Sequence, residues 1–159
     1  DSLKAVWTPD GDALVISAAM NLHQAAHAPV YHHLYRVPVN GGELTQLTNS
    51  TDWSCSEARF SNDGRALYCL IEPHTEHVYE LTEIGRFDWS GDSVKGAPDV
   101  ITGSFDRSVK EMDISGNGRT VYVTANDAGR ARVYSLPAKG GDAEALDKDR
   151  KSTRLNSSH

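Results

Sequence analysis

The sequence lacks both a long apolar run and an excess of cationic side chains. Its 159 residues hold 16 lysines and arginines against 22 aspartates and glutamates, and the formal net charge is −6. Nucleic-acid binding depends mainly on cationic contacts to phosphate, and an anionic membrane surface also attracts a basic face. No apolar stretch approaches the roughly 20 residues of a membrane-spanning helix. The composition therefore predicts no nucleic-acid partner and no membrane partner.

Helical periodicity is also scarce. Apart from one or two turns within residues 21–27, no segment shows the 3.6-residue apolar spacing of an amphipathic helix. Short apolar runs rich in β-branched and aromatic residues recur instead, each preceded by a glycine-containing turn. This pattern favours an all-β chain.

One hairpin pattern occurs three times. In each copy a short polar turn ending in Asp-Gly or Asn-Gly leads into an apolar run, and these dipeptides supply the positive φ angles of a two-residue hairpin turn. The turn glycines lie 53 and 54 residues apart, and such a period is typical of repeat folds. The runs lack strict polar alternation, so we expect strands buried on both faces. The copies are WTPDGDALVISA (7–18), FSNDGRALYCLI (60–71) and ISGNGRTVYVTA (114–125), with turn glycines Gly11, Gly64 and Gly118.

The residues after each hairpin extend the repeat to four strands. Residues 31–48 and 131–146 share a strand, a Gly-Gly turn and a further short strand, whereas the middle copy keeps only a strand at 77–84 before a polar passage at 85–99. Four-stranded antiparallel sheets repeated around an axis are the blades of a β-propeller. The alternative is a generic sandwich or meander. The sequence predicts an all-β partial β-propeller of about three four-stranded antiparallel blades, at residues 2–48, 55–102 and 109–146.

The last eleven residues, DRKSTRLNSSH (149–159), show no repeat pattern. They match a one-frame translation of a common sequencing-library adapter oligonucleotide. We therefore expect residues 1–148 to form the propeller fragment and 149–159 to be a disordered tail outside the fold. Because closed propellers have about four to eight blades, we also expect the gene to continue beyond this portion.

The blade pattern resembles the propellers of the prolyl oligopeptidase family of serine peptidases and of the Tol-system translocation protein. The more specific stretch is GSFDRSVKEMDISGNGRTVYVTANDAGRARVYSLPAKGG, residues 103–141. Its Phe-Asp-Arg-Ser at 105–108, with Thr-Ala-Asn-Asp at 124–127 and Gly-Arg at 129–130, is similar to the acylaminoacyl-peptidase and dipeptidyl-peptidase V-like branch of that family.

This resemblance implies a substrate-gating role. Members of the family join a propeller to an α/β-hydrolase domain that cleaves short peptides or acyl-peptides, and the propeller limits access to the active site. The implied partners are a C-terminal α/β-hydrolase domain of the same parent chain and peptide substrates. The alternative is a non-enzymatic propeller that serves as a protein-interaction module, similar to the Tol-system protein. The sequence does not identify a compartment.

No catalytic residue is expected in this chain. The serine of an α/β-hydrolase lies in a strained G-x-S-x-G elbow after a buried strand. The nearest approach, residues 91–95, has lysine in place of the last glycine and no buried strand before it. No motif identifies substrate-binding residues either.

Six histidines cluster in two candidate loops, where a zinc site is conceivable. A His-x3-His pair needs a helix and a third ligand, so we predict solvated loops, with no metal and no cofactor. A weaker alternative is that these loops line the face that meets the hydrolase domain. The histidines are His23, His27, His32, His33, His74 and His77.

The two cysteines are predicted to be free. Continuing the pairing outward from a turn at 63–64 sets Ala58 opposite Cys69, so Cys55 lies three residues further along its strand. An odd offset places side chains on opposite faces of a sheet, and a disulfide needs Cα atoms within about 7 Å. We therefore expect buried thiols.

The aromatic residues fall into two groups. Trp7 and Phe60 occupy matching repeat positions, so we expect them in the core between blades. Trp53 and Trp89 fall outside the repeated strands, where loop packing and a substrate-facing role are both open.

Overall fold

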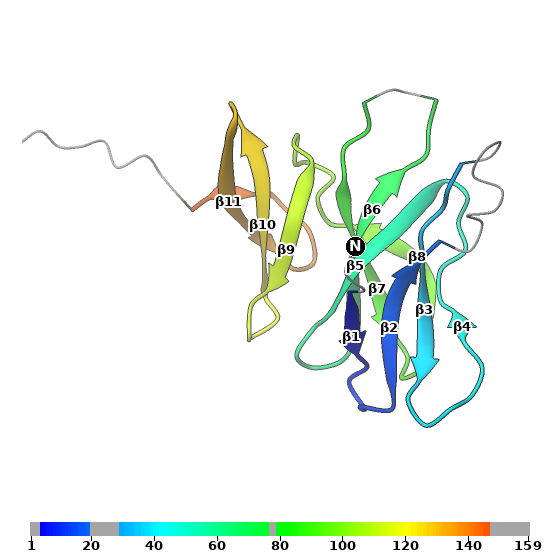
Figure 1. Ribbon diagram of the computed structural model, residues 1–159. Helices are drawn as coiled ribbons and strands as arrows, with labels where there is room; N and C mark the ends of the chain where they lie inside the picture. Colours follow the sequence, from blue (N-terminus) through cyan, green and yellow to red (C-terminus); the bar gives the residue numbers. More distant parts are fainter. Residues whose placement is uncertain (1–3, 20–28, 77–78, 147–159) are drawn as a thin grey trace, which may run out of the picture.

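The computed structural model describes residues 4–19, 29–76 and 79–146, and this part of the chain is built of strands and turns without a helix (Figure 1). No membrane-spanning helix therefore occurs among the described residues.

The strands form three four-stranded antiparallel sheets, each from four consecutive strands. Blade 1 holds β1 (Ala5–Trp7), β2 (Ala13–Ala18), β3 (His33–Pro38) and β4 (Thr45–Gln46). Blade 2 holds β5 (Trp53–Phe60), β6 (Ala66–Pro73), β7 (Glu83–Trp89) and β8 (Val94–Val100). Blade 3 holds β9 (Val109–Ile114), β10 (Thr120–Asp127), β11 (Arg130–Pro137) and β12 (Glu144–Ala145).

The three sheets confirm the predicted all-β architecture. Each sheet is a simple meander, and blade 2 lies between the other two (Figure 1). The expected tail at 149–159 lies outside the described residues, so its disorder stays a prediction.

The second half of blade 2 differs from the prediction. Of the expected strand at 77–84, positions 77 and 78 lie outside the described residues, 79–82 are not in a strand, and Glu83 and Ile84 begin β7. The polar passage expected at 85–99 is wrong, because β7 and β8 occupy it, joined by a turn at Ser90 to Ser93. Arg86 and Asp88, which form an ion pair of 2.9 Å, gave β7 its polar character in the sequence. Gly85 has a packing reason, since a Cβ there would lie 2.2 Å from Ile71 Cδ1.

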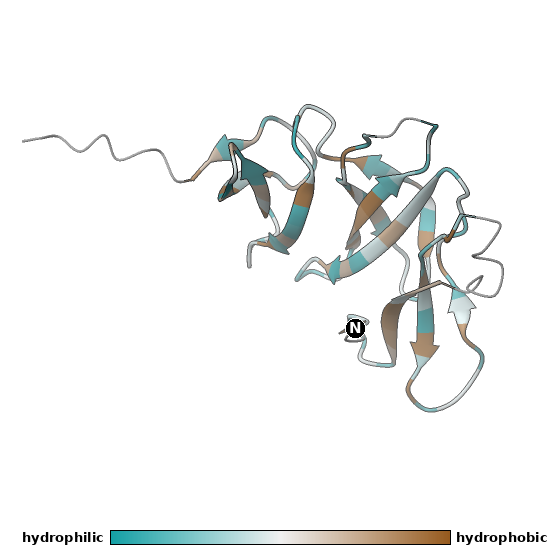
Figure 2. Ribbon diagram, turned by 45° about the horizontal axis from the view of Figure 1, so that its top comes forward, coloured by the Kyte–Doolittle hydropathy of each residue, from teal (hydrophilic) through white to brown (hydrophobic). Residues whose placement is uncertain are grey.

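Two apolar cores flank strand β6. Its odd-numbered residues Leu67, Cys69 and Ile71 pack in the core between blades 1 and 2. Its even-numbered residues from Ala66 to Leu70 pack in the core between blades 2 and 3. Figure 2 shows apolar (brown) and polar (teal) residues mixed along the strands of the blades. Two-sided burial is thus confirmed for β6, whereas β2 and β10 alternate between buried and more exposed residues because each faces one described neighbour.

The three repeated turns share one hydrogen-bond pattern. In each, the glycine N–H donates to the carbonyl three residues earlier at 2.8–2.9 Å, and a Ser or Thr hydroxyl donates to an Asp or Asn side chain. The predicted two-residue turn is wrong. Only the glycine has positive φ, and four residues separate the paired positions Ser61 and Ala66. The hydroxyl and acceptor pairs are Thr8 with Asp10, Ser61 with Asp63, and Ser115 with Asn117, at 2.6, 2.6 and 2.7 Å.

Turns of neighbouring blades also touch. Asn62 Nδ2 of the blade 2 turn donates to the Gly116 carbonyl of the blade 3 turn at 2.7 Å. A Cβ on Gly64 would lie 2.8 Å from Pro9 Cβ in the blade 1 turn. The repeated turn therefore sets the spacing between blades as well as joining strands.

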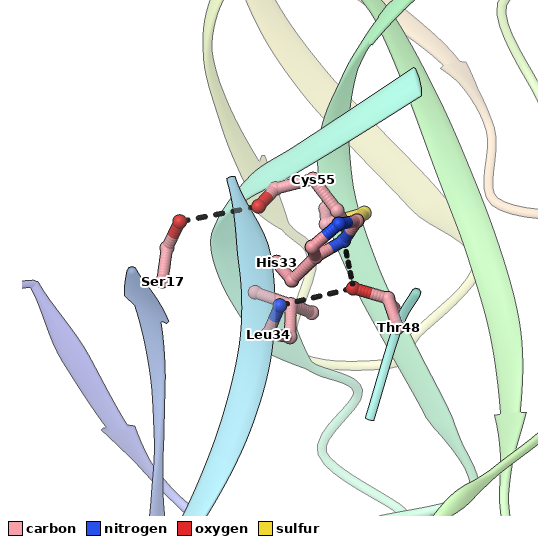
Figure 3. The surroundings of a disulfide bond; sticks show 6 residues. Ser17, His33, Leu34, Thr48 and Cys55 are labelled. Carbon is pink, nitrogen blue, oxygen red and sulfur yellow. Dashed lines mark hydrogen bonds between the residues drawn. A yellow bond between two sulfur atoms is a disulfide. The ribbon is translucent and has the colours of Figure 1, made fainter. Parts of the chain in front are cut away.

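The prediction of free cysteines is wrong, because Cys55 and Cys69 form a disulfide with Cα atoms 5.8 Å apart (Figure 3). The cause is a β-bulge in β5 between Ser56 and Arg59. It inserts one extra residue, so Cys55 pairs with Ile71 rather than with Glu72. The offset to Cys69 becomes two residues, and the two cysteines share a face.

The aromatic predictions are partly confirmed. Phe60 packs in the core between blades 1 and 2, with its ring 5.0 Å from that of Trp89. Trp53 and Trp89 lie in β5 and β7 and join the same core, so loop placement is wrong for both. Trp7 is 60% exposed, because it lies on the face of β1 turned away from blade 2. Its predicted core position is therefore wrong.

Gly64→Ala will lower the free energy of unfolding more than Gly118→Ala. Both glycines have φ near +70°, which costs an L-residue about 1–2 kcal/mol. In the Gly64→Ala variant the new Cβ also clashes with Pro9, which lowers the free energy of unfolding by roughly 1–3 kcal/mol more. Gly118→Ala adds no clash, because nothing lies within 4 Å of a Cβ on Gly118. Urea unfolding of the two variants measures the difference, and equal losses would contradict the contact between turns.

The turn carboxylates will make stability depend on pH in the acid range. Hydrogen bonds from Thr8 and Ser61, then from backbone N–H groups, lower the pKa values of Asp10 and Asp63. A folded-state pKa below the unfolded value of about 4 gives stability that is present above that pH and is lost on further acidification. The double variant Asp10→Asn with Asp63→Asn should flatten this loss, because Asn117 makes the same bonds in blade 3 without titrating.

The urea midpoint measured between about pH 2 and pH 6 tests this expectation. The double variant Asp52→Asn with Asp92→Asn removes the same charge at two other exposed bends and serves as the control. An acid profile of the Asp10 and Asp63 variant identical to that of the unmodified chain would disprove the assignment.

Candidate functional site

A groove of about 350 Å³ runs beside the first strands of the three blades, β1, β5 and β9, which lie near one another in Figure 1. Its walls come from all three blades and carry charges of both signs together with an aromatic ring. The charged and aromatic lining residues are Lys4, Glu57, Arg59, Glu111, Asp113 and Tyr122.

The charged lining follows the repeat. Lys4, Glu57 and Glu111 each lie seven residues before the turn glycine of their blade. Arg59 and Asp113 share the position five residues before it. Equivalent positions of radial repeats converge near the axis, which brings together residues more than 50 apart in sequence. The sequence analysis missed these residues, although the glycine spacing carried the signal that could find them.

Blade 2 presents Glu57 through the bulge of β5. Glu57 has φ of +56°, an uncommon value for a residue other than glycine, and bulges often redirect a side chain. Its carboxylate forms an ion pair with the ammonium of Lys4 in blade 1. Nearby, Arg59 donates to the Ala58 carbonyl at 3.0 Å. The groove thus has a cationic edge beside a carboxylate.

Blade 3 supplies the acidic and aromatic wall. Tyr122 pairs with Asp113 and Thr124 pairs with Glu111, on the face of the sheet turned away from blade 2. The Thr124 hydroxyl donates to Glu111 at 3.4 Å. Tyr122 is 39% exposed, so its ring is open to a ligand. This lining can bind a polar ligand through hydrogen bonds and ion pairs.

The nearest approach to a nucleophile motif lies away from this groove. Ser93 is in the exposed turn between β7 and β8, where its hydroxyl is 3.1 Å from that of Ser90 and its carbonyl accepts the Ser90 N–H at 2.9 Å. This hairpin turn has no strand-to-helix elbow. The absence of catalytic residues from the whole chain stays a prediction.

The histidines in the described residues lie at the junction of blades 1 and 2. His74 Nε2 is 2.6 Å from Ser54 Oγ, and His33 Nδ1 is 3.3 Å from Thr48 Oγ1. Burial, followed by the charges of His32 and His74, lowers the pKa of His33. The expected solvated loop is wrong for His33, which is buried in β3. The remaining predicted positions, 23, 27 and 77, lie outside the described residues.

The described ranges contain no group of side chains suited to bind a metal ion. Within 4–19, 29–76 and 79–146, no three His, Cys, Asp or Glu side chains are grouped so that they could hold an ion.

The Phe-Asp-Arg-Ser stretch connects the parts of blade 3. Arg107 lies 3.2 Å from Asp127 Oδ1, and Arg132 lies 3.0 Å from Asp127 Oδ2. The hydrogen bond from Arg107, with both nearby guanidinium charges, lowers the pKa of Asp127. Phe105 packs edge-on against Tyr134 at 5.0 Å, and the Ser108 hydroxyl accepts the Thr82 N–H at 3.1 Å. The sequence resemblance rests partly on the segments 105–108 and 124–127. The Asp127 carboxylate joins these two segments through Arg107 and so stabilises the blade.

Proteins similar to this chain in sequence or structure include peptidases and TolB proteins. A dipeptidyl-peptidase 5 of Aspergillus fumigatus is 30% identical over 146 residues, covering 85% of this chain and 19% of that protein. The chain thus spans about a fifth of the length of that relative. No family model matches the chain.

Three solved structures show the fold. The putative TolB of Agrobacterium tumefaciens superposes with a TM-score of 0.65 at 21% identity, covering 92% of this chain and 49% of that one. The β-propeller domain of the trilobed protease of Pyrococcus furiosus gives 0.59 at 18% identity, covering 90% and 38%. The acylaminoacyl peptidase of Pyrococcus horikoshii gives 0.59 at 22% identity, covering 91% and 20%. The three sheets are blades of a β-propeller, and the predicted resemblance to dipeptidyl and acylaminoacyl peptidases is confirmed.

Proposed function

We propose that this chain is the substrate-gating propeller part of a serine peptidase that hydrolyses short peptides or acyl-peptides. The carrying observation is the similarity to dipeptidyl-peptidase 5, which extends over 85% of this chain but only 19% of that protein. The catalytic serine, histidine and aspartate belong to an α/β-hydrolase domain elsewhere in the parent chain.

The groove supports the gating role. Its volume of about 350 Å³ is at the small end of ligand sites, and it lies where the first strands of the blades face one another. The main-chain amides and charged ends of a peptide are complementary to a lining of carboxylates, cations and a phenol ring. A large folded polypeptide does not fit such an opening, so the groove selects short or extended chains.

A second candidate is a non-enzymatic interaction module. It is favoured by the superposition on putative TolB, of which this chain covers 49%. The two candidates differ in whether the parent carries a reactive serine.

The parent protein will react with a fluorophosphonate probe at one serine outside residues 1–148. Recovery of the coding sequence past Lys148, expression of the parent and peptide mapping of the labelled protein test this expectation. The 159-residue chain is the control and should neither be labelled nor hydrolyse dipeptidyl or acyl-aminoacyl nitroanilides. A parent with further blades, no labelled serine and no turnover would favour the interaction module.

Glu111→Trp in the parent will discriminate against longer substrates. The indole fills part of the groove, so we expect kcat/KM for a peptide of about 15 residues, up to about 50 Å long when extended, to fall roughly tenfold. The labelling rate with the small probe should change little. Lys110→Trp is the matched control, because Lys110 is an exposed neighbour on β9 that does not line the groove. Equal effects of the two substitutions on the long peptide would contradict gating by this groove.

A further inference from the structure

The disulfide and the bulge of β5 lie in the same stretch of blade 2. Near the turn, Phe60 pairs with Leu67, which is the register that the turn alone dictates. Beyond the bulge, Cys55 pairs with Ile71, so one additional residue of β5 has been accommodated. Glu57, at positive φ, lies within the bulge.

The bulge determines on which face of the sheet the side chains of the first half of β5 lie. Without it, Cys55 would oppose Glu72 and face blade 3, while Cys69 faces blade 1. Side chains on opposite faces of one sheet cannot form a disulfide. The bond is therefore compatible with the bulged register and incompatible with the regular one.

We propose that the Cys55–Cys69 disulfide selects the bulged register of β5 and thereby positions Glu57 in the groove. A slip of one residue moves every side chain of the shifted segment to the other face of a sheet. The turn fixes the register at Phe60, and the disulfide fixes it on the far side of the bulge. This inference concerns the fold of the chain and holds for either candidate function.

Contacts to blade 1 depend on the same register. The Cys55 N–H donates to the His32 carbonyl at 2.8 Å. The Cys55 carbonyl accepts the Ser17 hydroxyl at 3.1 Å, as Figure 3 shows. Trp53 lies with its ring 6.2 Å from that of Phe87 in the core between these blades. A slip would turn Trp53 out of this core. The register of β5 thus links the disulfide to the blade 1 junction and to the ion pair of Glu57 with Lys4.

Burial determines when the bond can form or break. Both cysteines are fully buried, so an external dithiol reaches them only when blade 2 opens. Reduction transfers two electrons and two protons from the dithiol, which becomes a cyclic disulfide, and leaves two thiols. We therefore expect efficient reduction only when the chain is unfolded and refolded in the presence of the dithiol.

Three tryptophans provide the test, with the 159-residue chain labelled with 5-fluorotryptophan. Trp53 lies in the register-dependent segment, Trp89 lies in the same core on β7, and Trp7 is exposed on β1. ¹⁹F spectra compare the oxidised chain with chain refolded in dithiothreitol and with the Cys55→Ala, Cys69→Ala double variant. We expect the Trp53 resonance to shift or split while those of Trp89 and Trp7 keep their positions. Amide exchange at residues 53–57 should accelerate about tenfold or more.

Leu136→Ala is the control for general destabilisation, because Leu136 is buried in the core between blades 2 and 3, away from β5. It should leave a single Trp53 resonance. Unchanged Trp53 resonance and unchanged exchange at 53–57 in the reduced chain would overturn the proposal. The reduced chain and the double variant could both fail to fold while Leu136→Ala folds. In that case the disulfide stabilises the fold as a whole and does not select the register of β5, so the proposal is also overturned.

Discussion

Strand β6 lies between two apolar cores, and its residues from Ala66 to Ile71 alternate between them. A strand buried on both faces cannot hide its apolar surface within its own hairpin, so blade 2 needs a sheet on either side. Blades 1 and 3 supply these sheets. A polar group between blades 2 and 3 is satisfied as well, since the buried Tyr68 hydroxyl donates to the Ala138 carbonyl of blade 3 at 3.0 Å. The blades therefore stack because β6 has apolar side chains on both of its faces.

The repeated polar positions make this stacking specific. A buried threonine hydroxyl accepts a strand N–H in two blades, Thr48 from Leu34 at 3.0 Å and Thr102 from Ile84 at 2.9 Å. The Ser or Thr of each hairpin turn satisfies the N–H five residues later in the same manner. Because buried donors without partners are costly, these hydroxyls fix where each strand begins and ends, while the apolar cores supply most of the attraction.

The sequence allowed the blade pattern to be predicted, because turn glycines and apolar runs act locally and recur at a fixed spacing. It did not reveal the bulge, since no local pattern marks the extra residue at Glu57, and the ion-pair partner Lys4 lies far away in the sequence. The cysteine error followed directly from that missed residue. Trp7 was misplaced for a related reason, because the burial of a repeat position depends on whether a sheet covers its face. For β7, charged residues at the exposed positions hid the alternation.

The groove occupies the part of the fold that packing leaves free. The sides of the blades that face one another are buried in the cores, and the turns contact one another through Asn62 and Pro9. Among the described residues, the first strands and the outer face of blade 3 remain exposed where the three blades converge. Lys4, Glu57 and Glu111 occupy one repeat position there but differ in charge or partner, since Lys4 pairs with Glu57 and Glu111 accepts a hydrogen bond from Thr124. This repeat position therefore varies in charge from blade to blade while it stays at the groove, and on that ground we propose it, rather than the histidines or tryptophans, for ligand contacts.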